Sequence, residues 1–587
     1  MVSQREHIII GGGLAGLMAT IKVAEAGHKV KLFSIVPVKR SHSVCAQGGI
    51  NAAKNLKGEG DSPSIHFDET IYGGDFLANQ PLVKRMCEAA PDIIDMLDRM
   101  GVPFNRTTEG TLDFRRFGGS KFHRTAFAGA TTGQQLLYAL DEQVRRYEVD
   151  GLVEKFEGWE FLSAVFDDEP RCRGICAMDL KSMEIKSFSA DSVMLCTGGP
   201  GLIYGRSTNS TICTGSAASS VYQQGAYYAN GEFIQVHPTA IPGHDKLRLM
   251  SESARGEGGR IWTYKDGKPW YFLEEWYPAY GNLVPRDIAS RAIYKVVYEL
   301  KLGVNGKPIV YLDLSHISRE VLDKKLEGIL EIYEKFVGED PRKVPMMVFP
   351  AVHYSMGGLW VDNENQMTNV PGLFAAGEVD YQYHGANRLG ANSLVASIFA
   401  GMIGGPAMVK YVSGGINKQK SDDILLKEVT RQKEFNKKLL SSNGKENIGK
   451  LHDELGAMMT EHVTVVRHNK ATERVYHDLD KLMERFKNIS MDDKSDWANG
   501  SLVYARNLYN MLILAKVITA GALARNESRG AHYKPDYPDR DDKNWLKTTK
   551  AKYRPSGPEL SYEAVDISLI QPRPRKYDVG DGAKGTE

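Results

Sequence analysis

The stretch that decides the fold occupies residues 7–34 and reads HIIIGGGLAGLMATIKVAEAGHKVKLFS. A short apolar run at 7–10 leads directly into the pattern G-x-G-x-x-G at 11–16. An alanine-rich helical pattern follows, Gly27 ends it, and a second apolar run covers 29–33. This order predicts a strand, a helix and a second parallel strand, which together form a βαβ unit.

The glycine pattern predicts a binding site for a dinucleotide. Glycines allow the tight turn and the close backbone approach that place a pyrophosphate on the N-terminus of a helix. The strand before the pattern and the helix after it make the prediction specific. An acidic residue usually ends the second strand and binds the ribose, but Ser34 stands at that position. A simple NAD site is therefore less favoured.

Composition excludes several classes of protein. The chain has 587 residues, with 74 Lys and Arg against 73 Asp and Glu, so it lacks the basic excess of an electrostatic nucleic-acid binder. Six scattered cysteines are too few for a disulfide framework or a four-cysteine metal site, and we expect no metal. We also expect no signal peptide. The apolar stretch 508–524 contains Asn510 and Lys516, which favour a buried helix over a membrane-spanning one.

Residues 38–50 read VKRSHSVCAQGGI, a run of small and polar residues that suits backbone pressed against a flat ring system. The segment resembles the flavin-attachment motif of succinate dehydrogenase and fumarate reductase flavoprotein subunits, bacterial ones in particular. The resemblance implies FAD bonded covalently to His42. Three further segments continue it in the family's order: MLCTGG at 194–199, GLFAAGEVD at 372–380 and HGANRLGANSL at 384–394.

The resemblance implies a set of cofactor contacts, among which Glu378 is expected at the FAD ribose. One position departs from the family, which often has a TGDG-like stretch where this chain has Ser216, so a contact from there is in doubt. The expected cofactor-binding residues are Gly11, Gly12, Gly13, Leu14, Ala15, Gly16, Ser34, Arg40, Ser41, His42, Ala46, Gln47, Gly48, Gly49, Gly198, Gly199, Glu378, Asn392, Ser393 and Leu394.

Succinate, the family's substrate, is a small dicarboxylate, so its site needs cations for two carboxylates. The motif QVHPT at 235–239 resembles the family's and implies that His237 is one carboxylate ligand. The motif PAVHY implies His353 as another, and GANRLG implies Arg388 as the clamp. Ser251 replaces the usual threonine and keeps a hydroxyl for the substrate.

Oxidation of succinate also requires a group that removes a proton from carbon. The resemblance assigns this role to Arg286, in the motif VPRD. Arginine is normally always protonated, so it needs assistance to carry a proton. The family's relay implies Glu252 and Arg255, in SESARGEGG, and their spacing of three places them on one helical face if the stretch is helical.

The predicted fold class is α/β, with a Rossmann-like FAD-binding domain interrupted by an α+β capping domain. We expect the FAD-binding domain at 1–237 and 350–415, with the cap at 238–349. A helical domain at 416–530 and an extended C-terminal segment at 531–587 follow. A cap that closes on the flavin domain excludes water and brings the proton-transferring group to the substrate.

The resemblance implies the flavoprotein subunit of a membrane-bound succinate:quinone oxidoreductase. The chain has no cysteine pattern for its own cluster, so electrons are expected to pass to an iron–sulfur subunit and a membrane cytochrome b anchor, with quinone reached only through these partners. The expected location is peripheral, on the cytoplasmic face of the cell membrane. Alternatives are a quinol:fumarate reductase working in the reductive direction, L-aspartate oxidase, a soluble fumarate reductase, or a subunit that has lost its chemistry.

Overall fold

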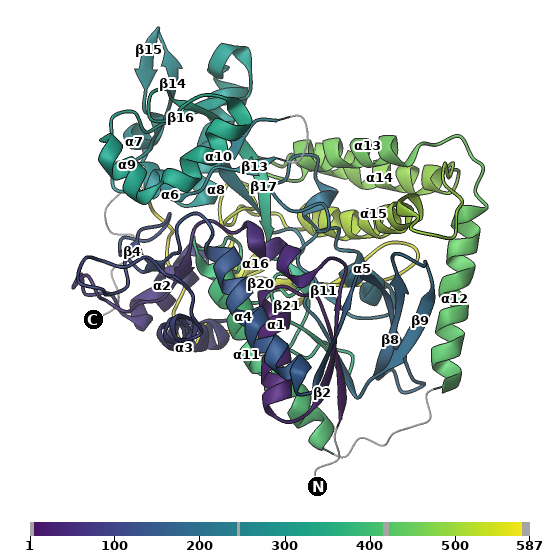
Figure 1. The fold of residues 1–587 in the computed structure, drawn as a ribbon. Helices are drawn as coiled ribbons and strands as arrows, with labels where there is room; N and C mark the ends of the chain where they lie inside the picture. Colours follow the sequence, from purple (N-terminus) through teal and green to yellow (C-terminus); the bar gives the residue numbers. More distant parts are fainter. Residues whose placement is uncertain (1–4, 244–246, 415–421, 578–587) are drawn as a thin grey trace.

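The computed structural model describes residues 5–243, 247–414 and 422–577 (Figure 1). At its centre lies a five-stranded parallel sheet in the order β19-β10-β1-β2-β6. The βαβ prediction is confirmed, because the first strand, the helix and the second strand occupy the expected residues. The bounds of these elements are β1 Glu6–Ile10, α1 Leu14–Glu25, β2 Lys29–Ser34, β6 Val153–Glu157, β10 Ser192–Leu195 and β19 Leu373–Ala375.

Close approach of backbones explains the glycines of the first turn. A Cβ on Gly11 would lie 2.1 Å from the carbonyl oxygen of Cys196, which directly follows the neighbouring strand β10. A Cβ on Gly16 would lie 1.9 Å from the carbonyl oxygen of Gly11. Larger side chains would therefore push the helix away from the sheet, and the dinucleotide turn would open.

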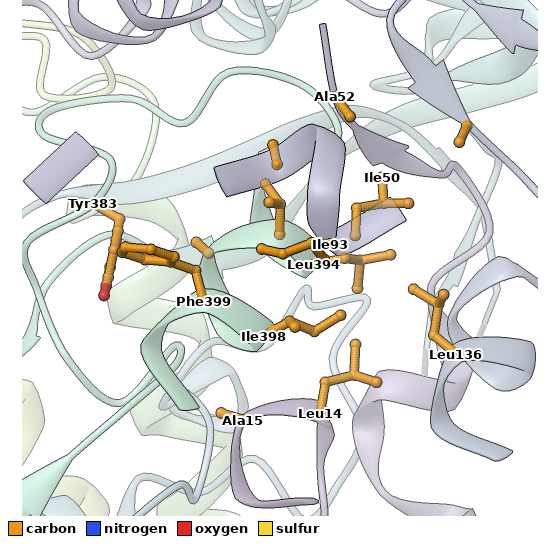
Figure 2. Packing of buried hydrophobic residues seen from close by; sticks show 14 of the residues in the cluster. Leu14, Ala15, Ile50, Ala52, Ile93, Leu136, Tyr383, Leu394, Ile398 and Phe399 are labelled. Carbon is orange, nitrogen blue, oxygen red and sulfur yellow. The ribbon is translucent and has the colours of Figure 1, made fainter. Parts of the chain in front are cut away.

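Helix α1 packs against α11, Asn392–Ser413, and α4, Thr132–Val149, on one side of the sheet (Figure 1). A Cβ on Gly401 would lie 2.5 Å from the carbonyl oxygen of Ala15, so α1 and α11 meet closely. Figure 2 shows the apolar core between them, with labelled side chains that include Leu14, Leu394 and Ile398. Adjoining elements are α2 Pro63–Gly73, α3 Gln80–Arg99, β3 Ile50–Asn51, β4 Phe114–Arg115 and β5 Thr125–Ala126.

An antiparallel sheet of β7 Trp159–Phe166, β8 Cys172–Asp179 and β9 Ile185–Ser189 is inserted between β6 and β10. It continues from β6 through a tight turn, in which the amide of Gly158 donates to the carbonyl of Ser34 at 2.8 Å. The start of β7 is therefore fixed beside the end of β2, at the edge where a dinucleotide fold binds its ribose.

The expected cap carries a six-stranded sheet in the order β13-β12-β17-β16-β14-β15. Strands β12, Ile234–Ile241, and β17, Met346–Ser355, pair antiparallel and run between the flavin-binding part and the cap. The expected boundaries at 237/238 and 349/350 therefore fall inside strands. The other cap elements are β13 Arg248–Leu249, α6 Ser253–Gly256, β14 Arg260–Lys265, β15 Lys268–Trp270, α7 Phe272–Trp276, α8 Arg286–Tyr294, β16 Val310–Asp313, α9 Arg319–Lys325 and α10 Glu327–Val337.

Helices dominate after the second flavin-binding part, as predicted, although the expected boundary at 415/416 lies outside the described residues. They are α12 Asp422–Leu440, α13 Ile448–His462, α14 Asn469–Phe486 and α15 Gly500–Ala524. Helices α11 and α15 are long and apolar enough to cross a membrane, but 61% and 72% of their most apolar stretches are buried inside the protein. The prediction of a buried helix over 508–524 is therefore confirmed.

The C-terminal segment is not simply extended. Strands β20, Lys547–Lys552, and β21, Glu559–Ala564, form a hairpin that joins β11, Tyr228–Ala229, and β18, Gly358–Leu359. Paired backbone satisfies the hydrogen bonds that an extended tail would leave to water. Residues 578–587 of the expected tail lie outside the described residues.

Candidate active site

A cavity of about 570 Å³ runs from the glycine turn to the strands β12 and β17. Its wall joins the two parts of the flavin-binding domain to the cap, so residues far apart in the sequence face one space. Most residues expected from the sequence line this cavity: Gly11, Gly12, Gly13, Leu14, Ala15, Ser34, Ser41, His42, Ala46, Gln47, Gly48, Gly49, Gly198, His237, Ser251, Glu252, Arg286, His353, Glu378, Arg388, Ser393 and Leu394.

Two expected cofactor residues lie away from the wall. Gly16 packs its backbone on Gly11, which makes it a helix–strand spacer. Arg40 is exposed in a single turn of 3₁₀ helix, because that turn directs its side chain to solvent rather than toward the glycines. The sequence motif contains both residues, but the chain direction at 38–41 separates Arg40 from the cavity.

Two others support the wall from behind. A Cβ on Gly199 would lie 2.5 Å from Oε1 of Glu378, so this glycine makes room for the carboxylate. The amide oxygen of Asn392 lies 2.7 Å from Nδ2 of Asn51 and 2.9 Å from Nε2 of His66. These contacts fix the N-terminus of α11 and leave Asn392 outside the cavity.

The cavity wall contains buried polar atoms that have no protein partner. They are Oγ of Ser41, Oε1 of Gln47, Oε2 of Glu160, Nε2 of His237 and Nε of Arg388. Buried polar groups are almost always hydrogen-bonded, so these atoms are positioned to bind a ligand. A glycine turn at one end and unpaired donors and acceptors along the wall fit FAD, with its pyrophosphate, hydroxyl groups and ring edges.

Contacts at both ring nitrogens orient His42, which lies in the 3₁₀ helix His42–Cys45. The backbone amide of Ser210 donates to Nδ1 at 3.2 Å. The side-chain nitrogen Nδ2 of Asn209 lies 3.1 Å from Nε2. The loop that carries these two residues was not expected to contribute, although the run STNST at 207–211 is rich in the side chains that form such contacts.

His237 and His353 lie side by side because β12 and β17 pair, and their ring centroids are 5.0 Å apart. The amide of Thr239 donates to Nδ1 of His237 at 3.2 Å, so the neutral ring carries its proton on Nε2, the atom without a partner. His353 meets the hydroxyl of Thr208 through Nδ1 at 2.7 Å. Burial, together with the nearby Arg286, holds the pKa of both rings well below the usual value.

Arg388 completes a cationic end of the cavity. Its guanidinium lies 4.6 Å from the ring centroid of Tyr354, a cation–π contact that orients the planar group. Burial lowers the pKa of Arg388 to about 9, and the charge of Arg286 adds to the shift. A cluster of buried cations with few anions to balance it is suited to binding a small dianion.

Glu252 joins two arginines, of which Arg255 was predicted from the spacing and Arg286 was implied by the resemblance. It accepts from Nη2 of Arg255 at 2.8 Å through Oε1, and from Nη2 of Arg286 at 2.6 Å through Oε2. Burial alone would raise the pKa of Glu252, but the charges of Arg286 and Arg255 outweigh it, and the pKa is lowered. Arg255 itself lies behind the wall, whereas Glu252 and Arg286 line the cavity.

Ser251 lines the cavity near this pair, and its hydroxyl lies 2.9 Å from the hydroxyl of Ser253. The amide of Ser253 also lies within hydrogen-bond distance of the Ser251 hydroxyl, at 3.2 Å. This oxygen therefore accepts from the backbone and remains able to donate into the cavity.

Gln235 is a site residue that the sequence did not reveal. Its Oε1 accepts from Nη1 of Arg286 at 2.9 Å, and its Nε2 donates to the carbonyl of Arg388 at 2.8 Å. One buried amide thus couples the two arginines, which come from the cap and from the flavin-binding part. Its place two residues before His237, on the same face of a strand, was the available signal.

The other end of the cavity holds a second unexpected residue, Glu160, at the start of β7. Burial raises the pKa of Glu160 to about 7, the charge of Arg506 opposes the shift, and Asn507 donates to it. Ser216 also lines this region, and its hydroxyl accepts from Nδ2 of Asn510 at 2.7 Å. A carboxylate therefore lies in this region although position 216 is not acidic. Among the described residues, no cluster of His, Cys, Asp and Glu is arranged to hold a metal ion.

Comparisons with known proteins agree with this geometry. A family model of the FAD binding domain matches residues 6–394, and one of the fumarate reductase flavoprotein C-terminus matches 452–577. The chain is 66% identical to the succinate dehydrogenase flavoprotein subunit of Bacillus subtilis, over 99% of this chain and 100% of that protein. It is 35% identical to the fumarate reductase flavoprotein subunit of a Serratia species, over 97% and 96% of the two chains.

A solved structure of E. coli quinol fumarate reductase aligns with a TM-score of 0.91 at 33% identity, over 98% of this chain and 99% of that one. The Mycobacterium smegmatis protein Sdh1 aligns with a TM-score of 0.83 at 28% identity, over 96% and 95%. This chain therefore belongs to the FAD-dependent oxidoreductase family of succinate dehydrogenase and fumarate reductase flavoprotein subunits.

Proposed function

We propose that the chain is the flavoprotein subunit of a membrane-bound succinate:quinone oxidoreductase and converts succinate to fumarate. The observation that carries the proposal is the group of His237, His353, Arg286 and Arg388 at one end of a cavity whose other end is a dinucleotide turn. Two histidines and two arginines match two carboxylates, and the flavin-binding turn supplies the neighbouring redox group.

In this proposal, Arg388 and the two histidines bind the substrate dianion. The Nε2 proton of His237 and the free Nε of Arg388 are donors without protein partners, so a carboxylate satisfies both. Enclosure strengthens these contacts, because charges interact more strongly where water is excluded. The substrate is thereby held still with its central carbon–carbon bond fixed between the two clamped ends.

Proton transfer falls to the cap residue Arg286. FAD, when bound, supplies the chemistry that takes up the hydride from the substrate. Arg286 first passes its own proton to Glu252 and then, as the neutral guanidine, accepts the proton from the neighbouring carbon. Glu252 and Arg255 exchange the released proton with solvent. A doubly hydrogen-bonded carboxylate next to the guanidinium stabilises its charge before transfer and is placed to receive its proton.

We propose that His42 bonds covalently to FAD through Nε2. Once a carbon occupies Nε2, Nδ1 keeps the lone pair that accepts from the amide of Ser210, so the observed contact suits the attached state. His42→Ser tests this step, because protein denatured on a gel should lose its flavin fluorescence. Fluorescence that survives in the variant would overturn the assignment of His42.

The partners follow from the chemistry and from the relatives, which are named as subunits of succinate dehydrogenases and fumarate reductases. Electrons that reach a flavin in pairs must leave singly for a quinone, so we propose an iron–sulfur subunit and a membrane cytochrome b anchor. The chain would then be peripheral on the cytoplasmic face of the membrane. The fumarate-reducing direction remains the alternative because the same groups operate in both directions.

Purification of the native complex from membranes tests the whole proposal. Succinate-dependent reduction of a quinone analogue, with co-purifying iron–sulfur and anchor chains, is the expected result. Malonate should perturb the flavin spectrum, because it offers two carboxylates to the same cations but no oxidisable bond. Faster fumarate reduction than succinate oxidation would favour the alternative direction. Hydrogen peroxide formation from L-aspartate would overturn the proposal in favour of an oxidase.

A further inference from the structure

The stretch 565–577, after the β20–β21 hairpin, crosses the outside of the flavin-binding part and ends against the cap. Gln80, at the start of α3, accepts from the amide of Ile570 at 2.9 Å and donates to its carbonyl at 2.8 Å. Arg573 pairs with Asp68 of α2 at 2.5 Å. These contacts attach the stretch to the flavin-binding part along its length.

Its last described residues reach the cap helix that carries Arg286. Arg575 donates from Nη1 to Oδ2 of Asp287 at 2.6 Å and from Nη2 to Oδ1 at 3.0 Å. The side chain of Arg575 is 7% exposed and that of Asp287 is 1% exposed, so the two bonds form in a dry environment. A planar, two-bonded pair of this kind fixes orientation as well as distance.

Arg575 also faces the flavin-binding part, because Asp75 lies 3.9 Å from Nη1. Other cations near the two carboxylates include Arg291, 3.4 Å from Asp287, and Arg540, 2.8 Å from Asp75. The charge of Arg529 also acts on Asp75. Arg575 is therefore the cation that lies between two buried carboxylates, one from each side of the cap boundary. Its removal leaves both carboxylates with less compensation.

Tyr577 makes a parallel connection through apolar contact. Its buried ring meets Tyr280 of the cap at a centroid distance of 5.1 Å and Tyr72 of α2 at 5.6 Å, both edge-on. The hydroxyl of Tyr72 accepts from the amide of Lys576 at 2.5 Å. Ionic and aromatic contacts thus join the same three segments at one place.

Asp287 follows Arg286 directly in the first turn of α8. Contacts that hold Asp287 in place therefore also fix the position of the Arg286 backbone. We propose that Arg575 is a positioning residue for proton transfer, and that the stretch 565–577 fastens the cap to the flavin-binding part. This inference rests on the proposed function of Arg286. Displacement of a reacting group by about 1 Å can cost 10²-fold in rate, so a small tilt of α8 is sufficient.

Arg575→Met in the purified membrane complex tests the inference, with all rates expressed per covalently bound flavin. We expect turnover with succinate to fall 10- to 100-fold while the dissociation constant of malonate changes less than threefold. Arg575→Lys keeps the charge and one bond, and should recover part of the rate. Arg554→Met is the matched control, because Arg554 pairs with Glu559 on the exposed hairpin, and this variant should keep its rate.

The isotope effect with fully deuterated succinate separates positioning from general damage. Misplacement of Arg286 slows the cleavage of the carbon–hydrogen bond, so the isotope effect on kcat should increase in Arg575→Met. A smaller fraction of competent enzyme would lower kcat and leave the isotope effect unchanged, which would overturn the inference. Equal turnover per flavin in Arg575→Met and wild type would also overturn it, whereas a wild-type complex inactive with succinate would refute the proposed function itself.

Discussion

Both hydrogen bonds that Arg286 donates to Glu252 end on the same carboxylate oxygen, Oε2, at 2.8 Å from Nε and 2.6 Å from Nη2. The other oxygen, Oε1, accepts from Arg255 at 2.8 Å and from the amide of Gly118 at 3.1 Å. One carboxylate therefore serves two arginines with separate oxygens. This division matches the proposed relay, in which a proton passes from Arg286 through Glu252 to Arg255.

Glu252→Gln should lower succinate turnover by at least about 10²-fold, because a neutral amide presents a donor to one of the guanidinium groups and cannot take up a proton. Steady-state kinetics per bound flavin measure the change. Glu274→Gln is the control, since Glu274 also accepts two hydrogen bonds from one arginine of the cap, Arg260, but is partly exposed. An unchanged kcat in Glu252→Gln would exclude Glu252 from the relay.

Gln235→Met should reduce kcat by roughly tenfold or more while KM for succinate changes little. Methionine fills a similar volume but leaves Nη1 of Arg286 without its acceptor, and an unsatisfied buried donor costs about 1–3 kcal/mol. The same variant should keep its bound flavin, because Gln235 does not line the cavity. A large rise in KM with normal kcat would instead indicate a substrate-binding role.

Affinity for malonate should fall as the pH rises through about 9. Burial and Arg286 lower the pKa of Arg388 to about 9, so the free site loses this cation within the accessible range. Binding of a dianion favours the protonated guanidinium, and affinity is therefore highest below that pKa and decreases above it. Flavin difference spectra between pH 7 and pH 10 provide the measurement, and a flat profile would show that Arg388 stays protonated throughout this range.

Asp380→Asn should stabilise the protein at pH 8 and stabilise it less at pH 5. Burial raises the pKa of Asp380 from 3.8 to about 7, although Gln366 donates to it at 3.0 Å. A carboxyl with a raised folded-state pKa favours the native state most below its unfolded pKa, and this contribution is lost as the pH rises toward 7. The free energy of unfolding of the wild type should therefore fall by about 3 kcal/mol between pH 5 and pH 8 through Asp380 alone.

Thermal unfolding of wild type and Asp380→Asn at both pH values tests this expectation. The exposed Asp168 supplies the control substitution Asp168→Asn, which should leave the pH dependence unchanged. An equal difference in melting temperature at the two pH values would show that Asp380 does not titrate in this range.

Several parts of the site could be predicted from sequence because their causes are local. In the turn at 11–16, any side chain larger than that of glycine would collide with neighbouring backbone, so the glycines in the sequence indicate the turn directly. The spacing of Glu252 and Arg255 needed only one helical turn to become a contact, and α6 provides it.

Other parts depend on pairing between distant segments. The distance between His237 and His353 is decided by the register of β12 with β17, in which His237 faces Ala351. Arg40 belongs to the right motif but lies away from the cavity, because motif membership does not determine which way its side chain points. Gly16 lies away because its backbone packs on Gly11. Glu160 was missed because it belongs to no recognised pattern, and Gln235 was missed because only His237 of the motif QVHPT was given a role.

The sequence by itself determined the βαβ unit, the family and the chemical types gathered for a dicarboxylate and a flavin. Only the tertiary structure decided which of those groups meet, including Gln235 between two arginines and Arg575 between two carboxylates. The physical reason is the distance along the chain over which each interaction acts. Backbone conformation and helical spacing act over a few residues, whereas buried charges find their partners only after strands and helices hundreds of residues apart have packed.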